Sequence, residues 1–475
     1  MKFGTSGLRG LSTELMGPTS YQYADAFGRY LLESGRARKG EGILLGRDFR
    51  ESSPVIAANC SRALVALGFK VLDCGAVPTP ALALYGLQTG SAALMVTGSH
   101  IPADRNGIKF YRPDGEIDKE DELSISRLAA SPGNSPITED NPMSMEYRDE
   151  CAALFLARNK MLLPPGALAG LKVGIYQHST VARDMLMEVL AHYGAQVLPL
   201  GRSDTFVPVD TEAVSRETAE KLKAWTVEHH LDAVVSADGD GDRPLVADET
   251  GAAVRGDLLG LIAARFLNAS VVVTPVTSNS GIDTTGDYEV VRTRVGSPYV
   301  IAGMAEVIAA GKEGVLGFEA NGGVLTGSDF TINGKLLKAL PTRDCFLPML
   351  AVLALARQER KPLSEVTRSF ALPAAASDRL ENFPTEASAA LMAHLLKSRD
   401  NLSHFLEPIG EVAGTNEVDG LRVTLNDGRI IHFRPSGNAP EMRCYAEAKD
   451  EAAAGELLCA GLRRLREWSL SYPTR

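Results

Sequence analysis

Residues 94–102 read Leu-Met-Val-Thr-Gly-Ser-His-Ile-Pro. The apolar run ends abruptly in a turn of small residues, which is typical of a buried strand that runs into a loop. The turn carries a hydroxyl at Ser99 beside an imidazole at His100. In an α/β fold, chemistry is usually placed at the carboxyl end of such a strand. Taken alone, the turn also fits a serine that only caps a helix. The other motifs of the chain are needed to choose between a reactive serine and a structural one.

Composition excludes several classes of protein. A chain of 475 residues predicts about three or four domains. No apolar run approaches the roughly 20 residues of a membrane span, and the first residues resemble neither a secretory signal nor a transit peptide. A net charge of -10 argues against a general nucleic-acid binder. We therefore expect a cytoplasmic protein without nucleic-acid or membrane partners.

The six cysteines are dispersed and form no Cys-x-x-Cys pair. This pattern suggests neither a zinc knuckle nor a disulfide framework. Reduced thiols are the expectation.

Three successive segments share one plan, in which strands alternate with helices and an apolar strand ends in a small polar loop. In the first, a helix that begins at Ser53-Pro54 and ends at Gly68 separates two apolar runs. The three loops at strand ends are Thr97-Gly98-Ser99, Asp238-Gly239-Asp240 and Glu319-Ala320-Asn321. The plan predicts three related mixed α/β domains whose loops are directed at one central cleft.

The last hundred residues differ from the rest. A helix over about 336–359 is expected before them, and Pro and Ala then become frequent around 372–385. Residues 418–433 read as strand, turn and strand, and 450–468 as a helix, which predicts a C-terminal α+β domain. The domains are expected at 1–150, 151–254, 255–368 and 369–475.

Three aspartates at a spacing of two, Asp238, Asp240 and Asp242, point to a cation site. Their charges repel one another, and oxygen-only ligands favour Mg²⁺ or Ca²⁺ over zinc. A calcium loop of the EF-hand kind would use these as its first, third and fifth positions and Glu249 as its twelfth. However, its sixth position requires Gly and holds Arg243. A phosphatase of the haloacid-dehalogenase type, with an aspartyl nucleophile after a strand, is a second alternative.

Two further clusters combine glycine, hydroxyls and arginine. Residues 3–10, which include Thr5, Ser6 and Arg9, offer a close backbone approach and hydrogen-bond donors to an anion. Residues 434–443 have the composition of a phosphate clamp. Its candidate members are Arg434, Ser436, Gly437, Asn438 and Arg443.

The four motifs at 97–100, 238–243, 319–322 and 434–438, in that order, resemble those of the α-D-phosphohexomutase family. The resemblance implies a heart-shaped protein with one motif per domain around a central cleft. It implies that Ser99 carries a phosphoryl group and, with Asp238, Asp240 and Asp242, holds Mg²⁺. A hexose 1,6-bisphosphate would be the intermediate, and small sugar phosphates would be the substrates.

The resemblance also assigns the remaining site residues. Ser99, His100, Arg9 and Lys109 match catalytic positions around the reacting phosphate, where the last three stabilise charge or move protons. The substrate-binding set that it implies is Thr5, Ser6, Arg243, Arg294, Glu319, Asn321, Arg434, Ser436, Gly437, Asn438 and Arg443.

Some positions depart from the family pattern. Gly98 and Ile101 replace the usual Ala and Asn beside the serine, while Asn321 stands for a Ser and Gly323 for a His in the sugar loop. We expect interconversion of mannose 6-phosphate and mannose 1-phosphate. The alternative is a glucose or dual-specificity enzyme, because groups that grip the other hydroxyls cannot tell these sugars apart.

Overall fold

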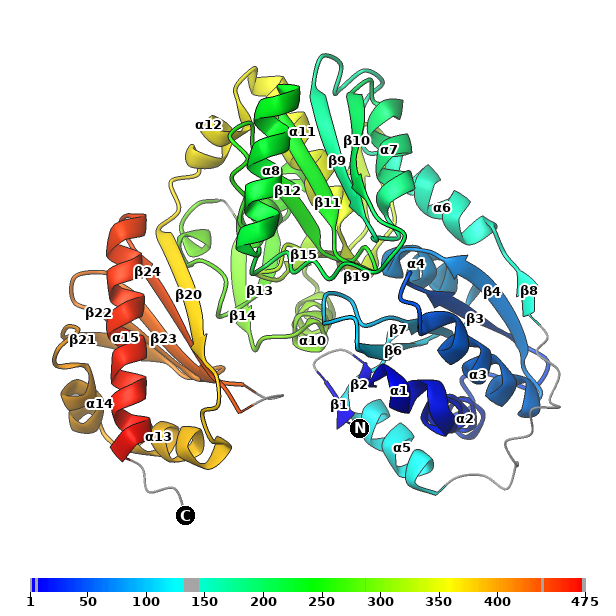
Figure 1. The fold of residues 1–475 in the computed structure, drawn as a ribbon, viewed down its shortest axis with the longest axis horizontal. Coiled ribbons are helices and arrows are strands. Elements are labelled where there is room, and N and C mark those ends of the chain that lie inside the picture. The colour runs from blue at the N-terminus through cyan, green and yellow to red at the C-terminus, as the bar shows by residue number, and fades with distance from the viewer. Residues whose placement is uncertain (1, 5–6, 132–144, 287, 437–439, 472–475) are drawn as a thin grey trace. The chain divides into compact units, whose positions relative to one another are not determined.

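The computed structural model describes residues 2–4, 7–131, 145–286, 288–436 and 440–471 (Figure 1). They form two compact units: unit 1 comprises Met1–Val272 and Gly296–Ser369, and unit 2 comprises Val273–Val295 and Phe370–Arg475. Within the described residues, no helix is long and apolar enough to cross a membrane.

The first domain of unit 1 is built on a mixed sheet of eight strands in the order β1-β2-β6-β5-β3-β4-β8, with β7 paired to β6. The strands are β1 Lys2–Phe3, β2 Leu8–Leu11, β3 Gly42–Arg47, β4 Lys70–Ala76, β5 Ala93–Val96, β6 Arg105–Arg112, β7 Gly115–Glu116 and β8 Met145–Tyr147. The helices are α1 Ser12–Glu14, the π-helical turn η1 Leu15–Thr19, α2 Ser20–Glu33, α3 Ser53–Ala66, α4 Thr79–Thr89 and α5 Lys119–Ala130. The predicted strand, helix and strand over 43–72 are confirmed.

Strand β5 lies inside this sheet because all four of its residues, Ala-Leu-Met-Val, are apolar and buried. It runs parallel to β3 and antiparallel to β6. In this register Met95 faces Lys109, and Gly107 on β6 faces Arg9 on β2. The pairing thus carries Arg9 and Lys109 to the sheet region where β5 delivers Ser99.

The second domain has four strands in the order β10-β9-β11-β12, all parallel except the last. They are β9 Lys172–His178, β10 Gln196–Arg202, β11 Ala233–Ala237 and β12 Pro244–Ala247, with helices α6 Glu150–Asn159, α7 Arg183–His192 and α8 Arg216–His229. The fully buried β11 ends directly before Asp238. The predicted arrangement of an apolar strand that delivers the aspartates is confirmed.

The third domain places β13, β15, β16 and β19 side by side in that order. Its strands are β13 Val271–Pro275, β15 Val315–Phe318, β16 Val324–Thr326, β17 Phe330–Ile332, β18 Lys335–Leu337 and β19 Leu340–Asp344. Its helices are α9 Gly256–Leu267, α10 Ser297–Ala309, α11 Phe346–Glu359 and α12 Leu363–Arg368. The buried β15 ends before Glu319, so the three domains share the predicted plan.

The helix predicted over 336–359 is wrong in its first ten residues. The helix α11 begins at Phe346, and the preceding residues form β18 and β19. The physical reason is the Asn333-Gly334 pair between β17 and β18. Both residues have positive φ, 50° and 74°, as a tight hairpin turn requires. The hairpin sends the chain back, and β19 then joins β16 in the sheet.

Unit 2 contains an antiparallel sheet in the order β20-β24-β23-β22-β21, against which the long helix α15 packs at β20 and β24 (Figure 1). The elements are η2 Ser280–Asp283, β14 Glu289–Thr293, β20 Ala374–Leu380, α13 Thr385–Lys397, α14 Arg399–Leu406, β21 Val412–Asn416, β22 Leu421–Leu425, β23 Ile430–Pro435, β24 Met442–Ala448 and α15 Glu451–Ser471. The predicted C-terminal α+β domain is confirmed.

Candidate active site

Ser99 sits in the turn after β5 in a left-handed backbone conformation, with a φ of 56°. Such a conformation costs a non-glycine residue on the order of 1–2 kcal/mol and needs support from its surroundings. The Ser99 amide donates to Thr97 Oγ1 at 2.8 Å, and the Thr97 hydroxyl donates to Asp48 Oδ2 at 2.8 Å. The serine is buried. Its backbone is therefore held by a chain of bonds that ends on the Asp48 carboxylate after β3.

Arg50 fastens the rest of this turn. Its guanidinium is 1% exposed and donates to four backbone carbonyls, those of Ser99, Ile101, Pro102 and Arg105, at 2.6–3.0 Å. Its Nε also donates to Asp48 Oδ2 at 3.2 Å. A Cβ at Gly98 would lie 2.7 Å from Arg50 Cζ. The glycine that departs from the family pattern thus leaves room for the arginine.

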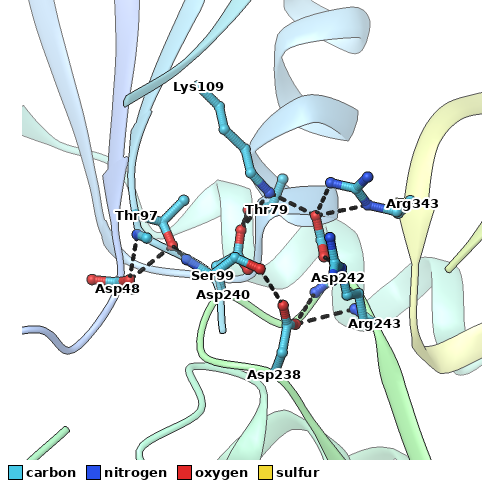
Figure 2. A network of polar contacts seen from close by, with 12 residues as sticks. Asp48, Thr79, Thr97, Ser99, Lys109, Asp238, Asp240, Asp242, Arg243 and Arg343 are labelled. Atoms are coloured by element: carbon cyan, nitrogen blue, oxygen red, sulfur yellow. Dashed lines mark hydrogen bonds and ion pairs between the residues drawn. The ribbon is translucent and has the colours of Figure 1, made fainter. Parts of the chain in front are cut away.

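The Ser99 hydroxyl points at an acidic loop. Ser99 Oγ donates to Asp238 Oδ2 at 2.5 Å (Figure 2). The same oxygen lies 3.2 Å from His100 Nδ1. Burial and the charges of Arg243 and Arg9 lower the pKa of His100 to about 3, against partial compensation by carboxylates. The imidazole is therefore neutral at physiological pH.

The three aspartates converge, with one carboxylate oxygen from each lying within 4.8 Å of the others. All three are buried. Asp240 Oδ2 accepts from Thr79 Oγ1 and Lys109 Nζ, both at 2.6 Å. Lys109 Nζ also donates to Asp242 Oδ2 at 2.6 Å. Asp238 Oδ1 accepts the amides of Asp242 and Arg243.

The donor set of this cluster fits a hard divalent cation. Asp240 Oδ1 and Asp242 Oδ1 are buried and have no hydrogen-bond partner among the described residues. Burial and the neighbouring charges of Asp240 and Asp242 raise the pKa of Asp238 well above its usual value, so this cluster stores charge repulsion that a cation relieves. Asp238, Asp240 and Asp242 are the residues that would hold it.

Basic side chains surround the aspartate cluster. Burial, with the charges of Arg243 and Arg343, lowers the pKa of Arg9 to about 10, so it stays charged. Burial lowers the pKa of Lys109 as well, but Asp240 and Asp242 outweigh it and the net shift is upward. Four cations, namely Arg9, Lys109, Arg243 and Arg343, thus face the three aspartates and Glu319. A phosphate in this site would meet an already assembled set of donors.

The loop after β15 carries Glu319 and Asn321. Arg343 connects this loop to the aspartate cluster, because it donates to both Glu319 and Asp242. The side chains of Glu319 and Asn321 are both buried. Asn321 Oδ1 accepts the amide of Gly323 at 3.0 Å, so its oxygen shapes the loop itself. A Cβ at Gly256 would lie 2.3–2.5 Å from backbone atoms of residues 320–322. Only glycine fits at the start of α9, and this close contact fixes the loop.

Unit 2 gathers a second basic cluster. Arg434 on β23 and Arg443 on β24 are cross-strand partners. Arg434 Nε donates to Asp419 Oδ2 at 2.9 Å, the same oxygen that accepts the amide of Val295. Arg294 Nε donates to the Val418 carbonyl at 3.2 Å. Within this unit, the predicted Arg294 and Arg434 are therefore connected through residues 418–419.

The structure thus assembles most predicted site residues in two groups. Unit 1 brings together Ser99, His100, Arg9, Lys109, the three aspartates, Arg243, Glu319 and Asn321. Unit 2 holds Arg294, Arg434, Arg443 and Ser436, whose amide donates to the Glu441 carbonyl at 2.9 Å. Thr5, Ser6, Gly437 and Asn438 lie outside the described residues.

Comparison with known proteins agrees with this geometry. Four family models match consecutive parts of the chain: phosphoglucomutase/phosphomannomutase alpha/beta/alpha domain I at residues 1–134, domain II at 155–251, domain III at 255–372 and the C-terminal domain at 377–460. The chain belongs to the phosphoglucomutase/phosphomannomutase family. It is accordingly an isomerase of the phosphohexomutase type, which transfers a phosphoryl group within its substrate.

Individual relatives extend along nearly the whole chain. A phosphomannomutase of Sinorhizobium fredii is 56% identical over 97% of this chain and 98% of its own length. A phosphomannomutase of Salmonella muenchen is 41% identical over 96% of this chain and 93% of its own. The solved structure of a Paramecium phosphoglucomutase, parafusin, in its open form has the same fold, with a TM-score of 0.76 at 16% identity over 98% of this chain and 95% of that one.

Sequence reasoning missed four residues that complete this phosphohexomutase site. Asp48 and Arg50 hold the serine turn, Thr79 donates to Asp240, and Arg343 donates to Asp242. The signal for the first two was present, because the Gly-Arg-Asp-Phe-Arg stretch at 46–50 also follows an apolar strand. Arg343 was hidden, because its segment was expected to be helical.

Proposed function

We propose that the protein interconverts mannose 6-phosphate and mannose 1-phosphate through a phosphorylated Ser99 and a hexose 1,6-bisphosphate. The observation that carries the proposal is the buried Ser99 hydroxyl, 2.5 Å from Asp238 and beside a cluster of carboxylates and basic groups. The 56% identity to a phosphomannomutase supports the choice of mannose.

The reaction divides into two transfers that use the same serine. In the first, the bond between phosphorus and Ser99 Oγ breaks while a sugar hydroxyl oxygen bonds to phosphorus, and the proton of that hydroxyl ends on Ser99 Oγ. The product is the bisphosphate. In the second, Ser99 takes the other phosphoryl group, and its proton goes to the sugar oxygen that is released.

The residues around Ser99 have separate tasks in this scheme. His100, neutral and 3.2 Å from Ser99 Oγ, is placed to pass the serine proton in each direction. Arg9, Lys109 and Arg243 would stabilise the charge on the phosphoryl oxygens during transfer. Such donors are effective because the site is buried and they need little reorganisation.

A Mg²⁺ ion held by Asp238, Asp240 and Asp242 would offset the negative charge of the phosphoryl group as it moves. Ser99 itself would join these ligands when phosphorylated. Lys109 contacts Asp240 and Asp242 in the described structure and keeps both carboxylates close together. The choice of Mg²⁺ rests on the all-oxygen donor set.

The remaining motifs complete the proposal. Glu319 and Asn321 would grip sugar hydroxyls, and Arg434, Ser436, Gly437, Asn438 and Arg443, with Arg294 beside them, would bind the phosphate that does not react. Thr5 and Ser6 would assist at the reacting phosphate. The catalytic serine, the cation loop, the sugar loop and the clamp would belong to domains at 1–150, 151–254, 255–368 and 369–475, in a cytoplasmic enzyme.

The test is a comparison of turnover on mannose, glucose and glucosamine 1-phosphates, with Mg²⁺ and a trace of hexose 1,6-bisphosphate. We expect the highest kcat/KM on mannose 1-phosphate and almost none in the Ser99→Ala variant. Glucosamine 1-phosphate is included because relatives at 27–30% identity are phosphoglucosamine mutases. A clear preference for either other sugar, or full turnover in Ser99→Ala, contradicts the proposal.

A further inference from the structure

Arg343 on β19 joins two loops that come from different domains. Its Nε and Nη2 donate to Asp242 Oδ2 at 3.0 and 2.7 Å, and its Nη1 donates to Glu319 Oε2 at 2.9 Å. Figure 2 shows its guanidinium directed at the Asp242 carboxylate. The side chain is 4% exposed. One buried group therefore fixes the distance between a carboxylate of the cation loop and one of the sugar loop.

A glycine makes room for this arrangement. A Cβ on Gly323 would lie 2.6 Å from Cδ, 2.7 Å from Cγ and 2.9 Å from Cβ of Arg343. Real Cβ atoms do not approach neighbours so closely, so any side chain at 323 would push Arg343 away from its partners. The departure noted in the sequence thus has a structural counterpart in Arg343.

Arg343 also determines which oxygen of Asp242 remains available. Oδ2 receives Lys109 and both Arg343 donors, while Oδ1 has no hydrogen-bond partner among the described residues. Arg343 therefore engages Oδ2 and leaves Oδ1, which lies 3.7 Å from Arg243 Nε, as the Asp242 oxygen that can face a cation. At the same time its positive charge lies beside the cation site and opposes a second positive charge there.

We propose that Arg343 is a positioning residue that sets the sugar loop relative to the cation loop and limits the cation affinity of the aspartate cluster. The inference rests on the proposed function for its sugar-binding half only. Arg343 is inferred to act through two separate properties, its charge and its shape. The charge of Arg343 controls how tightly Mg²⁺ binds, and its two-pronged shape controls where Glu319 lies.

Two substitutions distinguish charge from shape. Arg343→Met removes one positive charge, leaving Glu319 without this partner and Asp242 with Lys109 and Arg243 as its remaining cations. Mg²⁺ should then bind about threefold to tenfold more tightly, while KM for mannose 1-phosphate rises and kcat falls. Arg343→Lys keeps the charge but reaches one carboxylate, so Mg²⁺ affinity should stay within about twofold of wild type while KM still rises. Mg²⁺ affinity is measured by titration calorimetry on the dephosphorylated protein.

Arg158 provides the matched control. It is a buried arginine on α6 whose Nη1 donates to the Lys338 carbonyl at 2.7 Å and whose Nη2 donates to Thr326 Oγ1 at 3.4 Å, so these hydrogen bonds reach neither loop. Arg158→Met should lower thermal stability without changing Mg²⁺ affinity or KM. If Arg343→Met does not fold, Gly323→Ala decides, because it displaces the guanidinium from both carboxylates. KM should then rise, and Mg²⁺ should bind more tightly than it does to Arg343→Lys.

The outcomes separate this inference from the proposed function. Unchanged or weaker Mg²⁺ binding in Arg343→Met overturns the role in cation affinity, and an unchanged KM in both Arg343→Lys and Gly323→Ala overturns the role in sugar positioning. If the wild-type protein turns over no hexose phosphate, the proposed function fails. The calorimetric comparison still tests Arg343 in that case.

Discussion

At the scale of single residues, the reactive serine depends on side chains that never touch the substrate in the proposed scheme. Ser99 has a backbone conformation that L-residues rarely adopt, and Asp48, Thr97 and Arg50 hold it through hydrogen bonds. Sequence motifs identified Ser99, His100 and the aspartates because their chemistry is unusual. They did not identify Arg50, because a supporting arginine is recognisable only by what it contacts.

This support predicts a kinetic defect in Arg50→Lys. A lysine ammonium cannot serve four carbonyls and the Asp48 carboxylate at once, so the turn should relax and misplace Ser99 Oγ. We expect kcat to fall about 100-fold, with a smaller change in KM. Steady-state kinetics on mannose 1-phosphate measure both. Arg47→Lys is the control, since Arg47 is the last residue of β3, three residues before Arg50, and contacts Asp73 instead. An equal loss in that variant would contradict the prediction.

At the scale of elements, the sequence predicts apolar strands that end in polar loops. It does not predict which strands pair with one another in the third domain. An apolar run followed by Gly, Ser or Asp identifies β5, β11 and β15, because buried strands and polar turns have distinct compositions. The error over 336–345 arose because apolar residues around the Asn333-Gly334 turn also fit a helical period. There, pairing of β19 with β16 overrides the local pattern and places Arg343 in the site.

The packing of β6 against its neighbours predicts a specific sensitivity at Gly107. A Cβ there would lie 2.4 Å from the Leu8 carbonyl oxygen and 2.8 Å from that of Thr97. Both contacts are backbone, so Gly107→Ala must separate β2 or the serine turn from β6. We expect a loss of about 1–3 kcal/mol in the free energy of unfolding and a lower kcat.

Thermal unfolding and turnover of Gly107→Ala test this together. Gly414→Ala is the control, because Gly414 also lies in a strand but a Cβ there would contact nothing within 4 Å. Gly107→Ala with the stability and kcat of the control would show that β6 tolerates the extra atom.

At the scale of the whole molecule, the chain divides into two compact units, each of which contains a buried histidine. His432 on β23 bonds through Nε2 to the Asp419 carbonyl at 2.7 Å, while its Nδ1 has no hydrogen-bond partner among the described residues. Burial is the largest cause that lowers its pKa, which falls to about 4. In the unfolded chain the pKa is about 6.5, so the folded state binds fewer protons between these values.

Unit 2 should therefore lose stability as pH falls from 6.5 towards 4, and keep it fully above 6.5. The loss from His432 is on the order of 2 kcal/mol at pH 5. The chain has two tryptophans, of which Trp468 lies in unit 2 and Trp225 in unit 1. In a Trp225→Phe background, Trp468 fluorescence during urea unfolding at pH 7.5 and 5 reports unit 2. His432→Gln should show a smaller difference between the two pH values; an equal difference would contradict the assignment.

In the proposed mechanism, the covalent phosphate lies on Ser99. We expect protein incubated with hexose 1,6-bisphosphate and Mg²⁺, then quenched in acid and mapped by peptide mass spectrometry, to carry phosphate on Ser99. A phosphoserine resists hydroxylamine and is absent from Ser99→Ala. A hydroxylamine-sensitive phosphate on Asp238, Asp240 or Asp242 would instead indicate a phosphatase of the dehalogenase type, and would contradict the mechanism proposed here.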